Sequence, residues 1–252
     1  MPVEIKDERH TASGAAPEGA RDERSAAIAV QQMFDEISPR YDFLNQFLSM
    51  NIDRLWWWRA ARAVRDVLQR PEACALDLCC GTGDMARALR KQARDAEIVG
   101  ADFSRGMLQR GKQKFDSGNV RAVQADALCL PFSDQSFDVV VSAFGFRNLA
   151  NYDSGLHEIY RVLRPGGLVG ILDFSEPGGW FGKLYGFYFR NVLPKIGTLI
   201  SGVSGPYSYL PASVSRFPSP QGMLDRMKAI GFHDSSWEPY SFGIAGLYMG
   251  KR

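Results

Sequence analysis

The sequence has few cysteines, and no part of it approaches the roughly 20 consecutive apolar residues that a membrane span needs. The four cysteines include the adjacent pair Cys79 and Cys80, a spacing that fits neither a disulfide framework nor a zinc site. We therefore expect reduced thiols, no metal ion and a cytoplasmic protein. Residues 1–24 contain charges but no apolar core, so they do not resemble a signal peptide.

An excess of one sign of charge is also absent. Lys and Arg number 30 and Asp and Glu number 28, which leaves a net charge of +2. This balance argues against a protein that binds nucleic acid through its phosphates. What the sequence does have is a hydrophobic fraction of 45% over 252 residues, enough to bury a core without disulfides.

Short apolar runs alternate with amphipathic stretches through the middle of the chain, which indicates repeated βαβ units. We predict strands at 73–78, 97–101, 120–124, 137–142 and 168–174, with helices at 84–94, 104–116 and 152–163. Arg164-Pro-Gly-Gly167 predicts a helix stop and a turn before the fifth strand. A helix at 221–230 and two closing strands at 233–240 and 243–250 follow.

Five parts are expected along the chain. They are a disordered tail (1–25), an N-terminal helical lid (26–70), an α/β core (71–176), an aromatic helical insert (177–218), and a C-terminal helix with the closing strands (219–252). Within the lid we predict helices at 26–38, 41–50 and 52–68. The third helix contains Trp56, Trp57 and Trp58. Consecutive helical residues fan out around the axis, so at least one of these rings should lie outside the core.

The segment from Asp77 to Asp84, Asp-Leu-Cys-Cys-Gly-Thr-Gly-Asp, has the pattern of a strand end, a glycine turn and a helix start. Gly81 and Gly83 let the backbone turn tightly and approach a ligand, and the helix amides then face that ligand. We expect Asp84 to cap the helix. By itself the loop also satisfies the dinucleotide fingerprint, since Ala86 stands in the third position.

Aspartates stand at the ends of three successive predicted strands, where open α/β sheets bind ligands. Asp77 precedes the glycines, where a carboxylate would repel a pyrophosphate but suit the ammonium group of S-adenosylmethionine. Asp102 can accept both ribose hydroxyls of either cofactor. Asp126 can accept an adenine amino group while the Ala127 N–H binds the ring. The two closing strands also suit a methyltransferase sheet better than a dehydrogenase sheet.

Several segments together resemble one family. They are the loop 76–84, Phe144-Gly-Phe-Arg-Asn148, the run 160–167, the segment 34–42 with Leu44-Asn45 and Arg54-Leu-Trp56, Leu193-Pro-Lys-Ile-Gly197 and Tyr207-Ser-Tyr-Leu210. This pattern is similar to that of the menaquinone and ubiquinone biosynthesis C-methyltransferases. The resemblance implies a class I methyltransferase fold, Rossmann-like, with a mostly parallel seven-stranded sheet whose last strand is antiparallel. It also implies methyl transfer from S-adenosylmethionine to a ring carbon of a polyprenylated quinol.

The resemblance and the motifs together give the candidate site. The cofactor-binding candidates are Asp77, Gly81, Thr82, Gly83, Asp102, Phe103, Asp126, Ala127 and Ala143. Ala143 stands where some family members have serine, so we expect no side-chain contact from it. The catalytic candidates are Arg147, Asn148, Tyr41 and Asp42. Arg147 would orient the quinol oxygen or stabilise its anion, directly or through water, unless it only forms an ion pair. Tyr41 and Asp42 would close over the cofactor.

The sequence leaves several alternatives for the substrate that accepts the methyl group and for the partners of the protein. Demethylmenaquinol is the preferred substrate, with a benzoquinol of ubiquinone synthesis or another small molecule as the alternative. A nicotinamide dehydrogenase and a non-catalytic scaffold protein are the rivals from other classes. Because a polyprenylated quinol resides in the membrane, we expect a peripheral contact at its inner face, made by the aromatic insert or one of the tryptophans. A homo-oligomer is left open.

Overall fold

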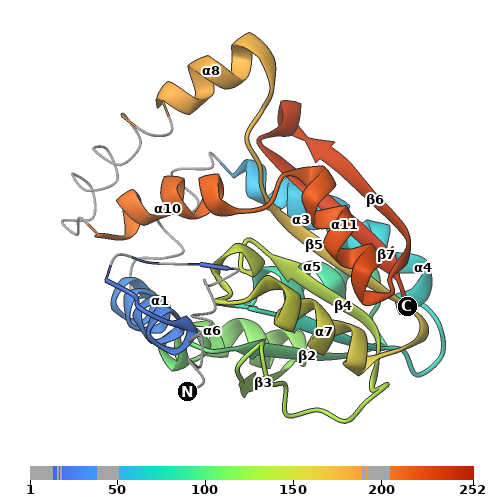
Figure 1. Ribbon diagram of the computed structural model, residues 1–252. Coiled ribbons are helices and arrows are strands. Elements are labelled where there is room, and N and C mark those ends of the chain that lie inside the picture. The colour runs from blue at the N-terminus through green and yellow to red at the C-terminus, as the bar shows by residue number, and fades with distance from the viewer. Residues whose placement is uncertain (1–13, 16, 18, 39–50, 189–190, 192–204) are drawn as a thin grey trace, which may run out of the picture.

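The computed structural model describes residues 14–15, 17, 19–38, 51–188, 191 and 205–252. Within these residues seven strands form one sheet in the order β3-β2-β1-β4-β5-β7-β6. The first five strands are parallel to one another, and β7, the last strand of the chain, is antiparallel to β5 and β6. The predicted class I methyltransferase sheet is therefore confirmed (Figure 1).

Six of the seven strands begin and end within two residues of their predicted bounds. The strands are β1 (Cys74–Leu78), β2 (Glu97–Asp102), β3 (Arg121–Gln124), β4 (Phe137–Ala143), β5 (Leu163–Phe174), β6 (His233–Tyr240) and β7 (Ala245–Lys251). The exception is β5, which begins at Leu163. The predicted turn at 164–167 lies inside this strand as a bulge, where the pairing with β4 shifts register and Gly166 adopts a φ of 78°.

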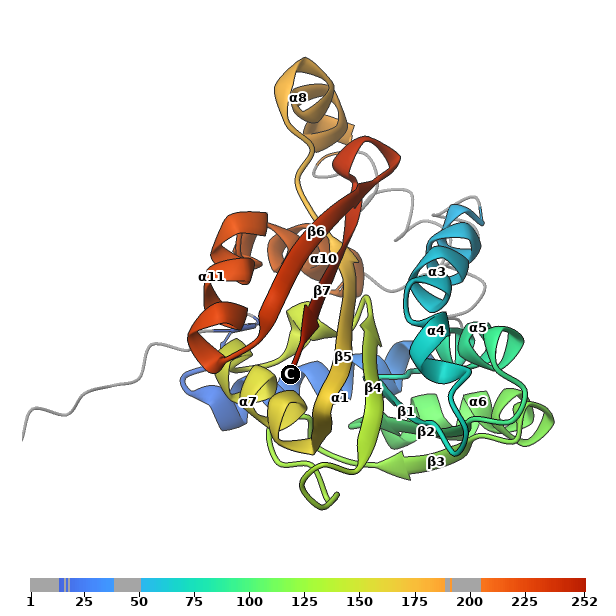
Figure 2. The same ribbon diagram turned by 90° about the vertical axis from the view of Figure 1, so that its right-hand side faces the viewer.

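Helices cover both faces of the sheet (Figure 2). They are α1 (Glu23–Ile37), α3 (Ile52–Ala63), α4 (Arg65–Leu68), α5 (Asp84–Gln92), α6 (Arg105–Gly118), α7 (Tyr152–Val162), α8 (Gly179–Phe187), α10 (Gly205–Arg216) and α11 (Pro220–Ile230). Apolar side chains of α3 to α6 pack on one face, and those of α7 and α11 pack on the other. Two short turns, η2 (Phe146–Asn148) and η4 (Ser241–Gly243), follow β4 and β6.

The N-terminal region differs from its prediction in two ways. The single helix expected at 52–68 is broken at Val64, whose φ of −103° and ψ of 3° are not helical. Val64 packs into the core at this turn, together with Val67 and Leu68 of α4, whereas Arg65 and Asp66 are exposed. The first helix begins at Glu23, before the expected position 26, since Asp22 forms a capping box with Ser25.

Part of the expected tail also packs on the protein. Ala15 is buried, and its N–H donates a hydrogen bond to the Leu149 carbonyl oxygen. The predicted helix at 41–50 and most of the segment after α8 lie outside the described residues. None of the described helices is long and apolar enough to cross a membrane.

Candidate active site

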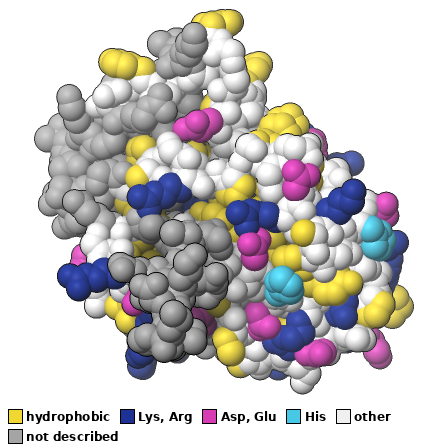
Figure 3. Space-filling view, in the orientation of Figure 1, with side chains coloured by type: hydrophobic (Ala, Val, Ile, Leu, Met, Phe, Trp, Pro, Cys, Tyr) yellow, Lys and Arg dark blue, Asp and Glu magenta, His cyan; other side chains and the backbone are white. Residues whose placement is uncertain are grey.

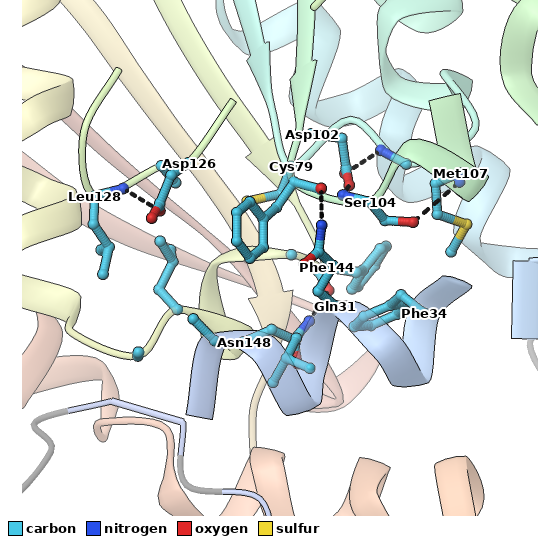
Figure 4. Close-up of a pocket in the computed structure, with 18 of the residues that line it drawn as sticks. Gln31, Phe34, Cys79, Asp102, Ser104, Met107, Asp126, Leu128, Phe144 and Asn148 are labelled. Atoms are coloured by element: carbon cyan, nitrogen blue, oxygen red, sulfur yellow. Dashed lines mark hydrogen bonds between the residues drawn. The ribbon is translucent and has the colours of Figure 1, made fainter. Parts of the chain in front are cut away.

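A cavity opens at the carboxyl ends of the parallel strands β1, β2, β3 and β4. It has a volume of about 730 Å³ including its open mouth, within the range of pockets that hold cofactors. Residues that follow β1, β2, β3 and β4 form one side, and α1 forms the other (Figure 4). The cavity therefore lies where open α/β sheets place their ligands.

Asp102 faces this cavity at the end of β2. One of its carboxyl oxygens accepts a hydrogen bond from the Gly81 N–H at 2.8 Å, and the other accepts one from the Ser104 N–H, also at 2.8 Å. Burial raises the pKa of Asp102 to about 6. Each oxygen retains a lone pair for a further donor, so the side chain is oriented to accept ribose hydroxyls.

The glycine loop divides its residues between the cavity and the packing behind it. Gly81, with a φ of 53°, lines the cavity. Gly83, with a φ of 89°, does not, and a Cβ there would lie 2.5 Å from the Phe115 ring. Its lack of a side chain serves the packing of α5 against α6.

The expected helix cap at Asp84 is wrong, because Gly83 occupies the cap position and Asp84 is the first residue of α5. The Asp84 carboxylate instead accepts a hydrogen bond from Lys114 Nζ at 2.9 Å. Lys114 also donates to Thr82 Oγ1 at 3.0 Å. Thr82 thus faces α6 and does not line the cavity. This cluster fixes the far side of the loop.

Asp77 is fully buried beneath the loop and does not line the cavity. Neither carboxyl oxygen has a well-formed hydrogen bond within the described structure, although the Ala86 N–H approaches closely enough to favour the ionised form. Burial nevertheless raises the pKa of Asp77 well above its usual range. A buried carboxyl group without a firm partner favours a nearby cation. The ammonium contact expected for Asp77 stays a prediction.

Helix α1 closes the cavity from the side opposite the strands. Gln31 and Phe34 point into it (Figure 4), and Gln31 Nε2 donates to the Phe103 carbonyl oxygen at 2.9 Å. One turn further, the Asp35 carboxylate accepts hydrogen bonds from Ser104 Oγ at 2.5 Å and from the Gly106 N–H at 2.9 Å. The helix predicted as a lid is therefore fastened to the loop between β2 and α6.

The segment Phe144–Asn148 contains residues that line the cavity and one, Arg147, that points away from it. Phe144 and Asn148 line the cavity, and Asn148 Oδ1 is buried without a hydrogen-bond partner in the described structure. Arg147 points away from the cavity. Its guanidinium forms an ion pair of 2.8 Å with Asp173, at side-chain exposures of 8% and 0%, and donates to the Phe144 carbonyl oxygen. The ion-pair alternative for Arg147 is thus the arrangement found.

Cys79 is half-buried and lines the cavity, while Cys80 is buried. Burial raises the pKa of both thiols well above the usual range, so both stay neutral near pH 7. Cys79 adopts a φ of 56°, a strained conformation for a residue with a side chain.

Seven of the thirteen candidate residues come together around the cavity: Gly81, Asp102, Phe103, Asp126, Ala127, Ala143 and Asn148. Asp77, Thr82, Gly83 and Arg147 support these residues from behind. Tyr41 and Asp42 lie outside the described residues. Among the residues that the structure describes, no three His, Cys, Asp or Glu side chains cluster as metal ligands do.

Sequence reasoning missed the contribution of α1 and of the start of α6, where Ser104 is the N-cap. Ala27, Val30, Gln31, Phe34, Ser104 and Met107 all line the cavity. The signal available was the apolar spacing of Ala27, Val30 and Phe34 on one helical face. That spacing alone does not say against which part of the core the face packs.

Comparison with known proteins identifies this arrangement. Residues 19–252 match the model of the ubiE/COQ5 methyltransferase family, a match that includes α1, the strand-end loops and the closing strands. The chain belongs to the ubiE/COQ5 methyltransferase family. It is accordingly an S-adenosylmethionine-dependent methyltransferase, and the cavity with Asp102 at its edge fits that cofactor.

Relatives extend over nearly the whole chain. The demethylmenaquinone methyltransferase of Deinococcus radiodurans is 44% identical over 245 residues, which cover 96% of this chain and 99% of that protein. The enzyme of the same name from Thermus thermophilus is 47% identical over 223 residues, which cover 87% and 100%. The crystal structure of an S-adenosylmethionine-dependent methyltransferase from Thermotoga maritima superposes with a TM-score of 0.63 at 19% identity, covering 87% of this chain and 98% of that one. This likeness shows the fold.

Proposed function

We propose that this protein methylates a ring carbon of demethylmenaquinol and so forms menaquinol. The observation that carries the proposal is the full-length similarity to demethylmenaquinone methyltransferases at 44% and 47% identity. The cavity supports it, because a mixed wall of apolar side chains and a few polar groups suits a flat aromatic ring beside a nucleoside.

When bound, S-adenosylmethionine supplies an electrophilic methyl group on a sulfonium centre. Methylation at carbon then requires an electron-rich ring held in line with that methyl group, and the protein contributes chiefly by positioning. Asp102 would hold the ribose and Asp126 the adenine, while Gly81 lets the backbone approach. The aromatic side chain of Phe144 would set the plane of the quinol ring.

Asn148 is the polar group best placed for the quinol oxygen. Its Oδ1 is buried without a partner in the described structure, whereas its Nδ2 lies 3.5 Å from the Phe144 carbonyl oxygen. A quinol O–H that donates to Oδ1 would gain a hydrogen bond and satisfy a buried acceptor. The amide oxygen only orients the O–H and does not take up its proton, which would pass to water at the open mouth of the cavity. As that proton leaves, the ring carbon beside the oxygen becomes more nucleophilic.

Arg147 would act through Asn148 and not by touching the quinol. The Arg147 guanidinium donates to the Asp173 carboxylate and to the Phe144 carbonyl oxygen. The Arg147 backbone N–H donates to Asp173 Oδ2 at 3.0 Å. Three bonds therefore fix the backbone between Phe144 and Asn148. We assign Arg147 as a positioning residue, because its charge is already neutralised by Asp173. Tyr41 and Asp42 remain candidates for closing the site.

The quinol is drawn from a membrane, so we further propose a peripheral contact with a membrane surface. The polyprenyl tail is too apolar to leave the bilayer, and only the ring needs to enter the cavity. A protein that stays close to the bilayer shortens that transfer.

An assay with S-adenosylmethionine labelled in its methyl group tests the proposal. Reduced demethylmenaquinone and a reduced 2-polyprenyl-6-methoxy-benzoquinone are offered separately and then in competition. Label should enter the naphthoquinol faster. Preferential label in the benzoquinol would favour the ubiquinone alternative, and label in neither would refute quinol methylation.

A further inference from the structure

Gln31 is the polar side chain that α1 contributes to the cavity. It is half-buried and lines the cavity together with Phe34 (Figure 4). Its Nε2 donates to the Phe103 carbonyl oxygen at 2.9 Å. This is the one hydrogen bond of the Gln31 amide among the residues that the structure describes, and it uses only the nitrogen.

The direction of the Gln31 amide follows from this bond. A carbonyl oxygen accepts hydrogen bonds and cannot donate, so the NH₂ end of the amide is the end that faces Phe103. Gln124 Nε2 donates to the same carbonyl oxygen at 3.1 Å and uses its second lone pair. Gln31 therefore cannot turn over without losing its bond to Phe103, and its Oε1 is left as an acceptor at the cavity wall.

The Gln31 amide and the Asp102 carboxylate are bonded to the same peptide group. The carbonyl oxygen of the peptide between Phe103 and Ser104 accepts from Gln31, and the N–H of that peptide donates to Asp102 Oδ1 at 2.8 Å. Because a peptide group is planar and rigid, the two side chains keep a fixed relation to each other. Both line the cavity, so a ligand bound to Asp102 lies next to Gln31.

The position of Gln31 decides which donor of the cofactor its Oε1 can reach. The nucleoside of S-adenosylmethionine offers an adenine amino group and two ribose hydroxyls. Asp126, the residue assigned to the amino group, follows β3, whereas Gln31 is bonded to Phe103, the residue after β2. A ribose hydroxyl is therefore the nearer donor. Asp102 remains the stronger acceptor because its carboxylate is charged, and Gln31 adds a neutral acceptor on the α1 side of the sugar.

Surface charge of one sign does not gather on the face of the molecule that Figure 3 shows. Lys and Arg side chains are interspersed there with Asp and Glu side chains, and the chain has a net charge of only +2. A strong steering field requires one sign of charge to gather around a site. Affinity for the cofactor should therefore depend mainly on contacts inside the cavity, where one further hydrogen bond has a measurable effect.

We propose that Gln31 Oε1 accepts a hydrogen bond from a ribose hydroxyl of bound S-adenosylmethionine. The α1 helix is then a binding element for the methyl donor and not only a wall of the cavity. The bond between Gln31 and Phe103 holds the amide in the orientation that this contact needs before the cofactor enters. The proposal concerns the methyl donor alone, so it holds whichever acceptor the protein methylates.

The test is calorimetric titration with S-adenosylhomocysteine and with its 2′-deoxy and 3′-deoxy analogues. Gln31→Met keeps the length of the side chain and removes the acceptor. It should bind S-adenosylhomocysteine about three- to tenfold more weakly, as expected for one lost hydrogen bond. The loss should shrink or vanish with the analogue that lacks the hydroxyl bound by Gln31. Protein variant and ligand variant together form a double-mutant cycle, so the contact of that hydroxyl with Asp102 cancels.

Gln124→Met is the matched control. It removes the other amide bond to the Phe103 carbonyl oxygen, from a residue that does not line the cavity. This variant should bind all three ligands within about twofold of the unmodified protein. Thermal melting followed by circular dichroism shows that both variants are folded at the temperature of the titration.

A loss in Gln31→Met that is of the same size with all three ligands would overturn the proposal, because Gln31 would then act only by holding α1 to Phe103. Unchanged affinity of Gln31→Met for S-adenosylhomocysteine would overturn it as well. A loss that shrinks with one or both analogues supports it and identifies the hydroxyl. S-adenosylhomocysteine has no methyl group to transfer, so a negative result leaves the proposed quinol methylation untouched.

Discussion

The guanidinium of Arg147 lies 2.8 Å from the carboxylate of Asp173, and both side chains are almost completely buried. Arg147 lies in η2, just after β4, and Asp173 lies at the end of the neighbouring strand β5, where Ala143 of β4 is in register with Leu172. The pair ties the turn after β4, which carries Asn148, to the end of β5. The Tyr152 hydroxyl supports it by donating to the Arg147 carbonyl oxygen at 3.1 Å.

Asp173→Asn leaves the Arg147 charge buried with a weaker partner. We expect a loss of about 3–5 kcal/mol in the free energy of unfolding, as for other broken buried pairs. Urea denaturation measures it. The control is Asp153→Asn, which breaks the more exposed pair with Arg226 and should cost no more than about 1 kcal/mol. Similar losses in the two variants would contradict a structural role for the buried pair.

Arg147→Ala should lower the rate of methyl transfer while affinity for S-adenosylmethionine is largely kept, because the residue does not line the cavity. The affinity is measured by titration and the rate by single turnover, both at a temperature where the variant is folded. Arg147→Lys keeps a charge but cannot reproduce the bonds to both Phe144 and Asp173, so it should also be slow. A variant with normal turnover would remove Arg147 from any role in the reaction.

Asn148→Ala removes the buried acceptor at the cavity wall. We expect turnover to fall by about 10²-fold, as when a single oriented polar group is removed from an active site, with S-adenosylmethionine affinity nearly unchanged. Asn148→Asp is the comparison, because it keeps an acceptor at the same place. If both variants turn over at the normal rate, the quinol oxygen lies elsewhere.

Affinity for S-adenosylmethionine should depend on pH through Asp102. Its folded-state pKa of about 6 means that the free protein carries the proton below that pH. The ionised carboxylate is the better acceptor for ribose hydroxyls, so affinity should be highest above pH 6 and fall by up to about tenfold per unit below it. Titration calorimetry between pH 5 and pH 8 measures this, with these limits chosen at about one to two units on either side of the pKa.

The control for this pH dependence is Asp102→Asn, which has no titrating group at that position. It should bind S-adenosylmethionine about 1–3 kcal/mol more weakly, without a step near pH 6. A step that persists in this variant would assign the titration to another acid, such as the buried Asp77.

Asp35 fastens α1, which forms one wall of the cavity, so Asp35→Ala should speed the release of S-adenosylmethionine. Two hydrogen bonds to the start of α6, from Ser104 Oγ and the Gly106 N–H, are lost, and we expect affinity to fall by about 1–3 kcal/mol. Glu36→Ala is the matched control, because Glu36 is the adjacent exposed acid on α1. Stopped-flow displacement measures the release. Equal rates in the two variants would show that α1 is held by other contacts.

The cavity wall formed by the strand ends could be predicted from the sequence. The opposite wall, formed by α1, could not. Apolar runs followed by Asp77, Asp102 and Asp126 place β1, β2 and β3 and one wall of the cavity. The opposite wall comes from α1, whose Asp35 meets Ser104 across 69 positions, and no local pattern specifies such a contact.

The contact between Arg147 and Asp173 could not be predicted from the sequence either. Asp173 stands at the end of the fifth predicted strand, as the other aspartates do on theirs, so its position was visible in the sequence. That it neutralises Arg147, and turns that side chain away from the cavity, depends on β4 and β5 being neighbours in this sheet. The family resemblance indicated the segment Phe144–Asn148. Which of its side chains line the cavity depends on how the segment packs against β5.

The measurement that tests the central claim most directly is nuclear magnetic resonance of the product after a single turnover. S-adenosylmethionine with a ¹³C-labelled methyl group is mixed with the protein and reduced demethylmenaquinone, and the position of the label is read from its chemical shift. The account predicts a methyl group on a ring carbon of menaquinol. A methyl group on a quinol oxygen, or an unchanged quinol beside intact S-adenosylmethionine, would contradict it.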